Sequence, residues 1–207
     1  SPFIWDGLDL LRRIHRAETI EGRTFAVIGG GNAAVDAARS LIRLGKKVQI
    51  IYRRTFDQMP AYPQEKRQAV EEGITVHQQL LVSAAREEDG RLRLTCSQAR
   101  LEGEDIAPGG EVDTMHVDRL VVATGQAAHM HIPRHERIVC GGDLSSGPGT
   151  VVQAMASGRQ AAQEILHRLA PEVQTDLKDS PSPMEKQAHG SLDYVPKEAP
   201  IVLAQRD

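Results

Sequence analysis

The sequence predicts an α/β protein in which a parallel β-sheet carries an inserted antiparallel β-meander. Two observations favour this fold class. In the first half of the chain, short apolar runs alternate with segments of helical periodicity, as in strand–helix–strand units. Between Leu80 and Leu101, apolar and polar side chains instead alternate around a Glu-Glu-Asp-Gly turn, which is typical of a β-hairpin.

The first expected elements form one strand–helix–strand unit preceded by a short helix. The helices repeat apolar residues every three or four positions, whereas the strands are apolar runs of the kind that parallel sheets bury. Gly45 ends the second helix, and the two lysines that follow it suit the negative end of the helix dipole. In chain order, these elements are Leu8–Ile14, Arg23–Ile28, Ala33–Leu44 and Val48–Tyr52.

Proline and glycine mark the later elements. Pro63 stands at the favoured first position of a helix that Gly73 ends. Pro108-Gly109-Gly110 predicts a second turn after the β-hairpin. The remaining expectations are strands at Ile74–Val76, Asp118–Ala123 and Ile138–Cys140, and a long amphipathic helix at Thr150–Leu169.

Composition excludes several classes of protein. A chain of 207 residues fits one large domain or one and a half, and its net charge of −3 gives it no general attraction to nucleic acid or anionic membranes. No apolar run approaches the roughly 20 residues of a membrane span, and the start lacks the pattern of a signal peptide. Cys96 and Cys140 lie too far apart for a CxxC pair and suit a reducing compartment. We therefore expect a cytoplasmic protein without a nucleic-acid or membrane partner.

A glycine-rich turn links the first strand of the strand–helix–strand unit to its helix. The turn contains Gly29-x-Gly31-x-x-Ala34, in the strand-to-helix context that a Rossmann-like dinucleotide site requires. The first glycine permits the tight turn, the second lets the backbone approach a pyrophosphate, and the N–H groups of the helix start face the phosphates. The alternative is a glycine-rich turn without a ligand. The residues predicted to bind the cofactor here are Gly29, Gly30, Gly31, Asn32 and Ala33.

The end of the next strand predicts which dinucleotide binds. NAD and FAD sites place an acidic residue about 20 residues after the glycines, where it accepts a hydrogen bond from the ribose 2′-hydroxyl. This chain has Arg53 and Arg54 there, whose guanidinium groups can pair with a 2′-phosphate that a carboxylate would repel. We therefore predict NADP(H); the alternative is that both arginines are solvated residues at a strand end.

One further pattern imitates a catalytic pair. Tyr62 and Lys66 have the YxxxK spacing of short-chain dehydrogenases, in which the lysine lowers the pKa of the tyrosine for proton transfer. In that family the pair lies far downstream of the glycine turn, whereas here it follows closely, and Pro63 begins the helix that would align both side chains. We therefore disfavour a short-chain dehydrogenase.

Three histidines, His129, His131 and His135, precede Cys140 and have the composition of a metal cluster. The stretch has no firm helical or strand frame and contains proline and charged residues, so we expect a solvated loop without a metal. Cys140 is expected to be a buried small hydrophobe. For Asp36, a hydrogen bond near the nucleotide and a partly exposed helix position remain equal alternatives.

Together, these motifs resemble the glutamate synthase small-subunit group of NADPH-dependent flavoprotein oxidoreductases, within the pyridine-nucleotide disulfide oxidoreductase superfamily. The resemblance runs in order from Leu8 to Leu169. It rests on VIGGGNAAVD at 27–36, YRR at 52–54, MPA at 59–61, EEG at 71–73, VVATGQ at 121–126 and GGD at 141–143. It implies the NAD(P)-binding domain of the two-dinucleotide-binding flavoprotein fold, followed by part of an FAD-binding domain.

In that family, the FAD-binding domain is split in sequence around the NADP(H)-binding domain. Its iron–sulfur segment and first FAD glycine motif have no counterpart here, so we expect this chain to be a later part of a longer enzyme. Asp143 matches the aspartate that binds the flavin's ribityl–phosphate region, and a helix start near Thr150 matches the one facing the flavin ring. The further cofactor-binding residues that the resemblance assigns are Gly125, Gly142, Asp143, Gly149, Thr150 and Val151.

The resemblance also implies a function. Hydride passes from NADPH to FAD and electrons pass to an iron–sulfur domain or subunit, which requires no catalytic side chain from this chain. Because one glycine motif cannot hold two dinucleotides, we expect the chain to bind NADP(H) and to retain FAD poorly. The alternative is a non-catalytic NADP(H)-binding sensor or assembly module. The expected segments are a helical lead-in at 1–22, the NADP(H)-binding domain at 23–126, the returning FAD-domain segment at 127–170 and an extended or disordered tail at 171–207.

Overall fold

The computed structural model describes residues 1–102, 105–125, 135, 137–147, 149–171 and 202–203. The chain forms two compact units. The first unit contains residues 1–125 and the short strand at 202–203, and the second contains the described residues between 135 and 171.

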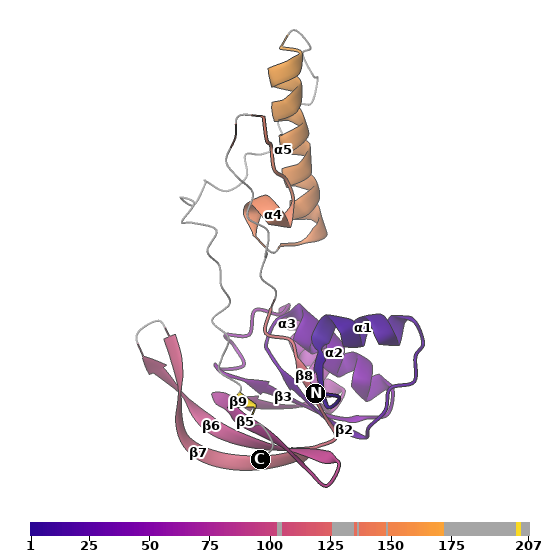
Figure 1. Cartoon of the computed structure of the whole chain (residues 1–207), viewed down its shortest axis with the longest axis vertical. Helices are drawn as coiled ribbons and strands as arrows, with labels where there is room; N and C mark the ends of the chain where they lie inside the picture. Colours follow the sequence, from indigo (N-terminus) through magenta and orange to yellow (C-terminus); the bar gives the residue numbers. More distant parts are fainter. Residues whose placement is uncertain (103–104, 126–134, 136, 148, 172–201, 204–207) are drawn as a thin grey trace. The chain divides into compact units, whose positions relative to one another are not determined.

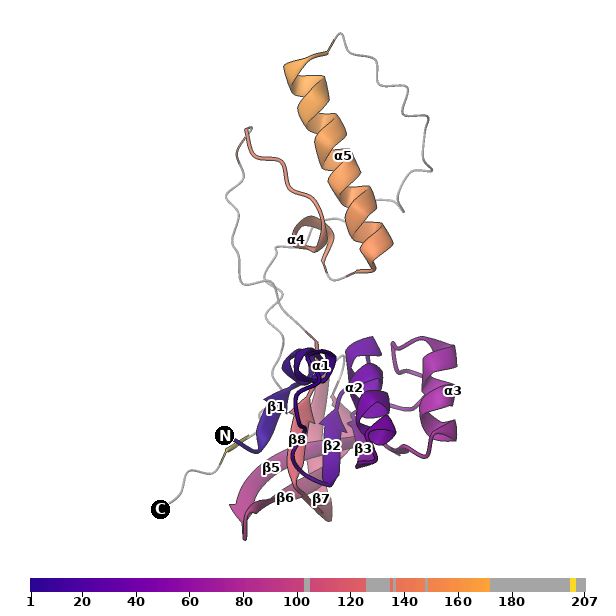
Figure 2. The same ribbon diagram turned by 90° about the vertical axis from the view of Figure 1, so that its right-hand side faces the viewer.

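The first unit is built on a five-stranded parallel sheet with the strand order β1-β8-β2-β3-β4. Helices α1, α2 and α3 cover one face of this sheet (Figure 1, Figure 2). The fold class and the strand–helix–strand unit are therefore confirmed, and β1 is a strand that the sequence did not predict. The strands are β1 (Ile4–Asp6), β2 (Thr24–Ile28), β3 (Lys47–Tyr52), β4 (Thr75–Gln78) and β8 (Arg119–Val122), and the helices are α1 (Gly7–His15), α2 (Asn32–Arg43) and α3 (Pro63–Glu71).

Side chains of the central strands alternate between two separate cores. Val27 and Val121 pack with the helices, whereas the neighbouring Ala26 and Leu120 pack with a second sheet, and all four are completely buried. The parallel sheet is thus covered on both faces, which explains why its strands are continuous apolar runs in the sequence.

Helix α2 packs on the parallel sheet through a face of small residues. Ala34 and Ala37 are completely buried, as is Leu41 one turn further along. Gly31 is the N-cap of the helix, and Gly45, with a φ of +75°, takes the left-handed conformation just beyond its C-terminus. The helix matches the predicted range to within one residue at each end.

The second sheet of the first unit has the strand order β7-β6-β5-β9 and packs on the face of the parallel sheet opposite the helices (Figure 2). Strands β5 (Leu80–Glu88), β6 (Arg91–Glu102) and β7 (Asp105–Val117) form the predicted antiparallel meander. Strand β9 (Val202–Leu203) pairs in parallel with β5. The predicted turn at Pro108-Gly109-Gly110 is wrong, because these residues lie within β7.

A β-bulge explains the proline and glycines inside β7. Between the pairs Ser97–Glu111 and Ala99–Pro108, β7 contains one more residue than β6. A bulge locally disrupts the ladder and admits proline and glycine, which a regular strand disfavours. A β-carbon at Gly109 would lie 3.0 Å from the carbonyl oxygen of Gln98, so the bulge brings two backbones close together.

The described part of the second unit contains the short helix α4 (Asp143–Ser146) and the long helix α5 (Val151–Leu169). A capping box begins α5: the side chain of Thr150 accepts from the N–H of Gln153, and the side chain of Gln153 accepts from the N–H of Thr150. The predicted long helix is confirmed. No described helix is long and apolar enough to cross a membrane.

The predicted strand at Ile138–Cys140 is wrong. A strand needs a hydrogen-bonded neighbour, and this segment pairs with no strand among the residues that the structure describes. Cys140 is partly exposed rather than buried, whereas Cys96 of β6 is completely buried in the first unit. Of the predicted tail at 171–207, only residues 171, 202 and 203 are among the described residues.

Candidate functional site

The carboxyl ends of three adjacent parallel strands carry most of the predicted cofactor-binding residues. β2 lies between β8 and β3, and the three strands run in the same direction. The glycine turn follows β2, Arg53 and Arg54 follow β3, and Gly125 follows β8. Ligands of open α/β sheets bind at this edge, so the fold brings these predicted residues together at one place.

Gly29 is the residue of the turn that the fold itself requires. Its φ is +138°, and a β-carbon there would lie 2.2 Å from the carbonyl oxygen of Ala123, which follows β8. Its N–H donates to the carbonyl of Ile51 in β3 at 3.2 Å. Gly29 is therefore packed against the backbone on both sides, where no side chain fits.

Gly31 differs because the protein leaves open space beside it. A β-carbon at Gly31 would meet no described heavy atom within 4 Å, and no described side chain caps the start of α2. Within the described part of the chain, the N–H groups of Gly31, Asn32 and Ala33 donate to no protein acceptor. A helix start with free donors and open space next to a glycine fits a phosphate group.

Two hydrogen bonds join the glycine turn to the loop after β3, which spans residues 53–62. The carbonyl of Gly30 accepts from the N–H of Ala61 at 3.1 Å, and the side-chain oxygen of Asn32 accepts from the N–H of Tyr62 at 3.0 Å. The amide side chain of Asn32 thus acts within the protein, which its prediction as a cofactor contact did not anticipate. The turn and the loop form one connected surface.

Arg53 and Arg54 are two cations at this site that have no partner among the described residues. Neither guanidinium forms an ion pair or a hydrogen bond with a described residue, although Arg53 is exposed and Arg54 is half-buried. The backbone beside them is fixed, because the carbonyl of Arg54 accepts from the N–H of Gln79 at 3.0 Å. Two charged side chains without a protein partner are available to an anionic ligand.

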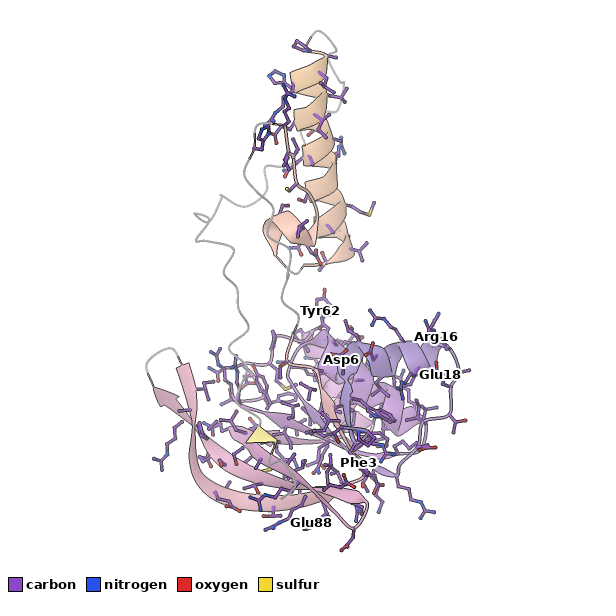
Figure 3. The ribbon with its side chains drawn as sticks, in the orientation of Figure 1. Phe3, Asp6, Arg16, Glu18, Tyr62 and Glu88 are labelled. Carbon is purple, nitrogen blue, oxygen red and sulfur yellow. The ribbon has the colours of Figure 1, made fainter. Side chains whose placement is uncertain are left out.

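Tyr62 and Lys66 do not form a catalytic pair in this structure. The Tyr62 side chain is 54% exposed and projects from the first unit (Figure 3). Lys66 is buried, and its ammonium group donates to the carbonyl oxygens of three residues of the loop after β3. No periodicity or motif in the sequence indicates these carbonyl contacts of Lys66.

Asp36 lies on α2 with an exposed side chain. Partial desolvation and the neighbouring Glu65 carboxylate raise its pKa, although Arg39 opposes the shift. Its carboxylate forms no hydrogen bond with a described residue, so the structure shows Asp36 as an exposed helix residue. A hydrogen bond near a bound nucleotide is not tested.

The histidine cluster is only partly described. His129 and His131 lie outside the described residues, and the ring of the exposed His135 accepts a hydrogen bond from the N–H of Arg137. Over the residues whose positions are described, no group of three histidine, cysteine or acidic side chains is arranged to hold a metal ion.

The second unit holds the predicted residues of the flavin side. Gly142, with a φ of +75°, precedes α4, and Asp143 is its exposed first residue. At the start of α5, the capping box occupies Thr150, and a β-carbon at Gly149 would lie 2.9 Å from the side-chain oxygen of Gln153. The exposed Val151 and its successor have N–H groups without an acceptor among the described residues.

Residues 5–145 match the model of the pyridine nucleotide-disulphide oxidoreductase family. The chain belongs to this family. The match includes the glycine turn, both arginines after β3 and Asp143. The predicted cofactors, NADP(H) and FAD, agree with membership of this oxidoreductase family.

The curated proteins that are similar to this chain include subunits of different enzymes. The β subunit of the NADP(+)-dependent formate dehydrogenase of Moorella thermoacetica is 33% identical over 192 residues, which cover 77% of this chain and 27% of the relative. The glutamate synthase [NADPH] small chain of Halomonas elongata is 29% identical over 186 residues, which cover 73% of this chain and 39% of the relative. The chain therefore spans well under half of these relatives, and the glutamate synthase group is one of several with comparable similarity.

Solved structures confirm the fold. A Cu(II) complex of a mutant of the HOCl-induced flavoprotein disulfide reductase RclA from Escherichia coli has a TM-score of 0.59 at 15% identity. That likeness covers 80% of this chain and 40% of the reductase. The L-lysine 6-monooxygenase of Pseudomonas syringae has a TM-score of 0.50 at 13% identity, over 74% of this chain and 46% of the monooxygenase.

Proposed function

We propose that this chain is the NADP(H)-binding part of a flavin-dependent oxidoreductase that passes hydride from NADPH to FAD and electrons onward to an iron–sulfur partner. The observation that carries the proposal is the pair of arginines at the carboxyl end of β3, Arg53 and Arg54, which have no partner among the described residues. They stand where NAD-binding sites place a carboxylate. Family membership and the names of the relatives, one NADP(+)-dependent and one NADPH-linked, support the same cofactor.

The chain's own groups would bind NADP(H) in two places. The N–H groups of Gly31, Asn32 and Ala33 at the positive end of α2 would hold the pyrophosphate. The guanidinium groups of Arg53 and Arg54 would pair with the 2′-phosphate through charge-assisted hydrogen bonds. Gly29 supports this geometry by letting β2, β8 and α2 approach closely.

The second unit would contribute to FAD binding. The exposed carboxylate of Asp143 is available to hydroxyl groups, and the N–H groups of the two residues after Thr150, which have no acceptor among the described residues, lie at the positive end of α5. The chemistry that the two cofactors supply when bound is hydride transfer from nicotinamide to flavin, for which the protein needs only to orient the rings and exclude water. We therefore assign no catalytic side chain.

Cofactor preference tests the proposal directly. We expect calorimetry on the full chain to show tighter binding of NADPH than of NADH. The double substitution Arg53→Ala and Arg54→Ala is expected to remove most of this preference. The loss of a hydrogen bond to a charged group corresponds to about 1.5–3 kcal/mol, or roughly 10- to 150-fold in the Kd of NADPH.

A matched control removes the same charge elsewhere. Arg86 and Arg100 are exposed arginines of the second sheet without an ion pair among the described residues. The double substitution Arg86→Ala and Arg100→Ala keeps the preference for NADPH. Equal affinity of the wild-type chain for both cofactors contradicts the proposal.

Flavin content tests the second half of the proposal. One glycine motif serves one dinucleotide, so the purified chain is expected to bind NADP(H) and to retain FAD poorly. An absorption spectrum with stoichiometric flavin bound to this chain would show that expectation to be wrong.

We further propose that the electron acceptor is an iron–sulfur domain or subunit, in keeping with relatives that are themselves subunits. We also propose a cytoplasmic location.

A further inference from the structure

Lys66 is a buried lysine whose ammonium group donates only to carbonyl oxygens of the loop after β3, as far as the described residues show. Its side chain enters from α3 and is 7% exposed. The ammonium group donates to the carbonyl oxygens of Phe56 at 3.0 Å, Asp57 at 3.3 Å and Met59 at 3.2 Å. Because an ammonium group has three N–H donors, these three carbonyls use its whole donor capacity.

Among the described residues, no carboxylate compensates this charge. Among the residues that the structure describes, Lys66 forms no salt bridge, and its nitrogen lies 5.1 Å from the centre of the Phe56 ring as a cation–π contact. Burying an ammonium group costs free energy unless it is fully hydrogen-bonded. An apolar side chain would fill this position without that cost, so the charge serves the conformation of the loop.

The loop that Lys66 holds connects the two parts of the candidate cofactor site. The loop begins with Arg53 and Arg54. Near its end, the backbone N–H groups of Ala61 and Tyr62 donate hydrogen bonds to the glycine turn. Between them, the hydroxyl of Tyr52 donates to the carbonyl of Gln58 at 3.0 Å, from the side of β3. The loop is therefore fixed at both ends and at four consecutive carbonyls, those of residues 56 to 59, before any ligand binds.

We infer that Lys66 is a positioning residue that sets cofactor specificity: it fixes the loop after β3 so that Arg53 and Arg54 meet the 2′-phosphate without first being ordered. This inference rests on the proposed NADP(H) site. A loop that is already in its binding conformation avoids the entropic cost of ordering on binding. NADH lacks the 2′-phosphate, so its affinity depends on the glycine turn and much less on this loop.

The test is the substitution Lys66→Met, which keeps the length of the side chain and removes its charge and donors. For the full chain, we expect the Kd of NADPH to rise about tenfold and that of NADH to change less than about threefold, measured by calorimetry. The preference for NADPH therefore falls. If Lys66 had a purely structural role, Lys66→Met would weaken the binding of both cofactors equally or would change only the thermal unfolding temperature.

Lys46→Met is the matched control. Lys46 also donates to backbone carbonyls, those of Ile20 and Gly22, but these lie near the amino end of β2. We expect Lys46→Met to lower the unfolding temperature without changing the ratio of the two Kd values. A change in that ratio as large as that of Lys66→Met overturns the inference.

A second variant keeps the inference testable if Lys66→Met does not fold. Tyr52→Phe removes one hydrogen bond from the same loop, that to Gln58, and keeps the ring in place. We expect it to lower the NADPH preference in the same direction, about two- to threefold. If Lys66→Met folds with the wild-type preference, or Tyr52→Phe keeps it, while the arginine substitutions abolish it, this inference is wrong and the proposed function stands. A wild-type chain without a preference overturns both.

Discussion

A β-carbon added at Gly29 would lie 2.2 Å from the carbonyl oxygen of Ala123, whereas one added at Gly31 would meet no heavy atom of a described residue within 4 Å. The two glycines of the same motif are thus required for different reasons. Gly29 also has a φ of +138°, while Gly31 has an ordinary φ of −83°. The protein needs the first glycine to fold, and a ligand approaching the helix start would need the second.

The two positions therefore predict opposite results. Gly29→Ala is expected to lower the free energy of unfolding by about 2–4 kcal/mol, because backbone strain and a backbone clash act together. Gly31→Ala is expected to cost less than about 1 kcal/mol of stability and to weaken NADPH binding clearly. Denaturant unfolding and calorimetry on both variants check this. A Gly31→Ala chain that binds NADPH like wild type would show that the open space is not used.

Single residues of the site could be predicted where backbone geometry or charge decides. The glycine turn and the arginines have fixed places relative to strand ends, so spacing along the chain predicted where they lie, while their contacts with a cofactor stay predictions. The contacts of Lys66 could not be predicted, because they join a helix to a loop in three dimensions and leave no periodic signal. The bond from Tyr62 to Asn32 escaped prediction for the same reason.

At the level of elements, one ion-pair network joins α2 to α3. Arg39 of α2 donates from two nitrogens to the carboxylate of Glu72, which follows α3, at 3.0 and 2.8 Å, and Arg43 adds a third contact at 2.5 Å. Glu65 of α3 also pairs with Arg39. The hydrogen bonds from Arg39 and then Arg43 lower the pKa of Glu72 to about 2, from an ordinary value of 4.5.

This lowered pKa predicts a pH dependence with a definite sign. The ionised form of Glu72 stabilises the native state, so its contribution is complete above about pH 4.5 and disappears as the pH falls through about 2. Glu72→Gln is expected to lower the free energy of unfolding by about 1–2 kcal/mol at pH 7, and the difference from wild type shrinks toward pH 2. Thermal unfolding between pH 7 and pH 2 measures it.

Glu71→Gln is the control for this prediction. Glu71 is the exposed neighbour on α3 and has no ion pair or hydrogen bond with a described residue. Its substitution should leave the unfolding free energy unchanged to within about 0.5 kcal/mol at every pH. If Glu71→Gln and Glu72→Gln give the same pH profile, the network between the helices does not contribute.

Helices and strands could be predicted where the apolar periodicity and the residues that begin or end an element agreed. α2 combines a helical apolar face with Gly31 before it and Gly45 after it, and the structure has the helix there. Pro108-Gly109-Gly110 indicates irregular backbone, but β-bulges and turns favour the same residue types. Only the pairing of β7 with β6 shows that this segment forms a bulge and not a turn. Ile138–Cys140 has the composition of a strand without a neighbour to pair with among the described residues.

At the scale of the molecule, Asp118 connects the two sheets of the first unit. Its carboxylate accepts from the N–H groups of Arg23 and Thr24, at the start of β2, and from Arg91 of β6 in the second sheet. Burial opposes its ionisation, but the backbone hydrogen bonds from Arg23 and Thr24 outweigh it and lower the pKa to about 2.

Removing this carboxylate should weaken the first unit as a whole. Asp118→Ala is expected to lower the free energy of unfolding by about 2–4 kcal/mol, since it leaves two backbone donors and a guanidinium without their acceptor. Glu111→Ala, which removes an exposed carboxylate of β7 without a described hydrogen bond, should have little effect. Urea unfolding followed by circular dichroism compares the two, and equal losses would contradict the role of Asp118.

The two cysteines give each unit a different chemical reactivity. Cys96 is completely buried in the first unit, and burial, with the nearby Asp113, raises its pKa to about 11, whereas Cys140 in the second unit is partly exposed. Only a thiolate attacks an alkylating reagent. A maleimide dye added to the native chain should therefore label one thiol, Cys140, and mass spectrometry of the digested product can locate it. The wild-type sequence would then carry a fluorescent reporter on the second unit alone, through which the response of that unit to added FAD can be followed without any mutation.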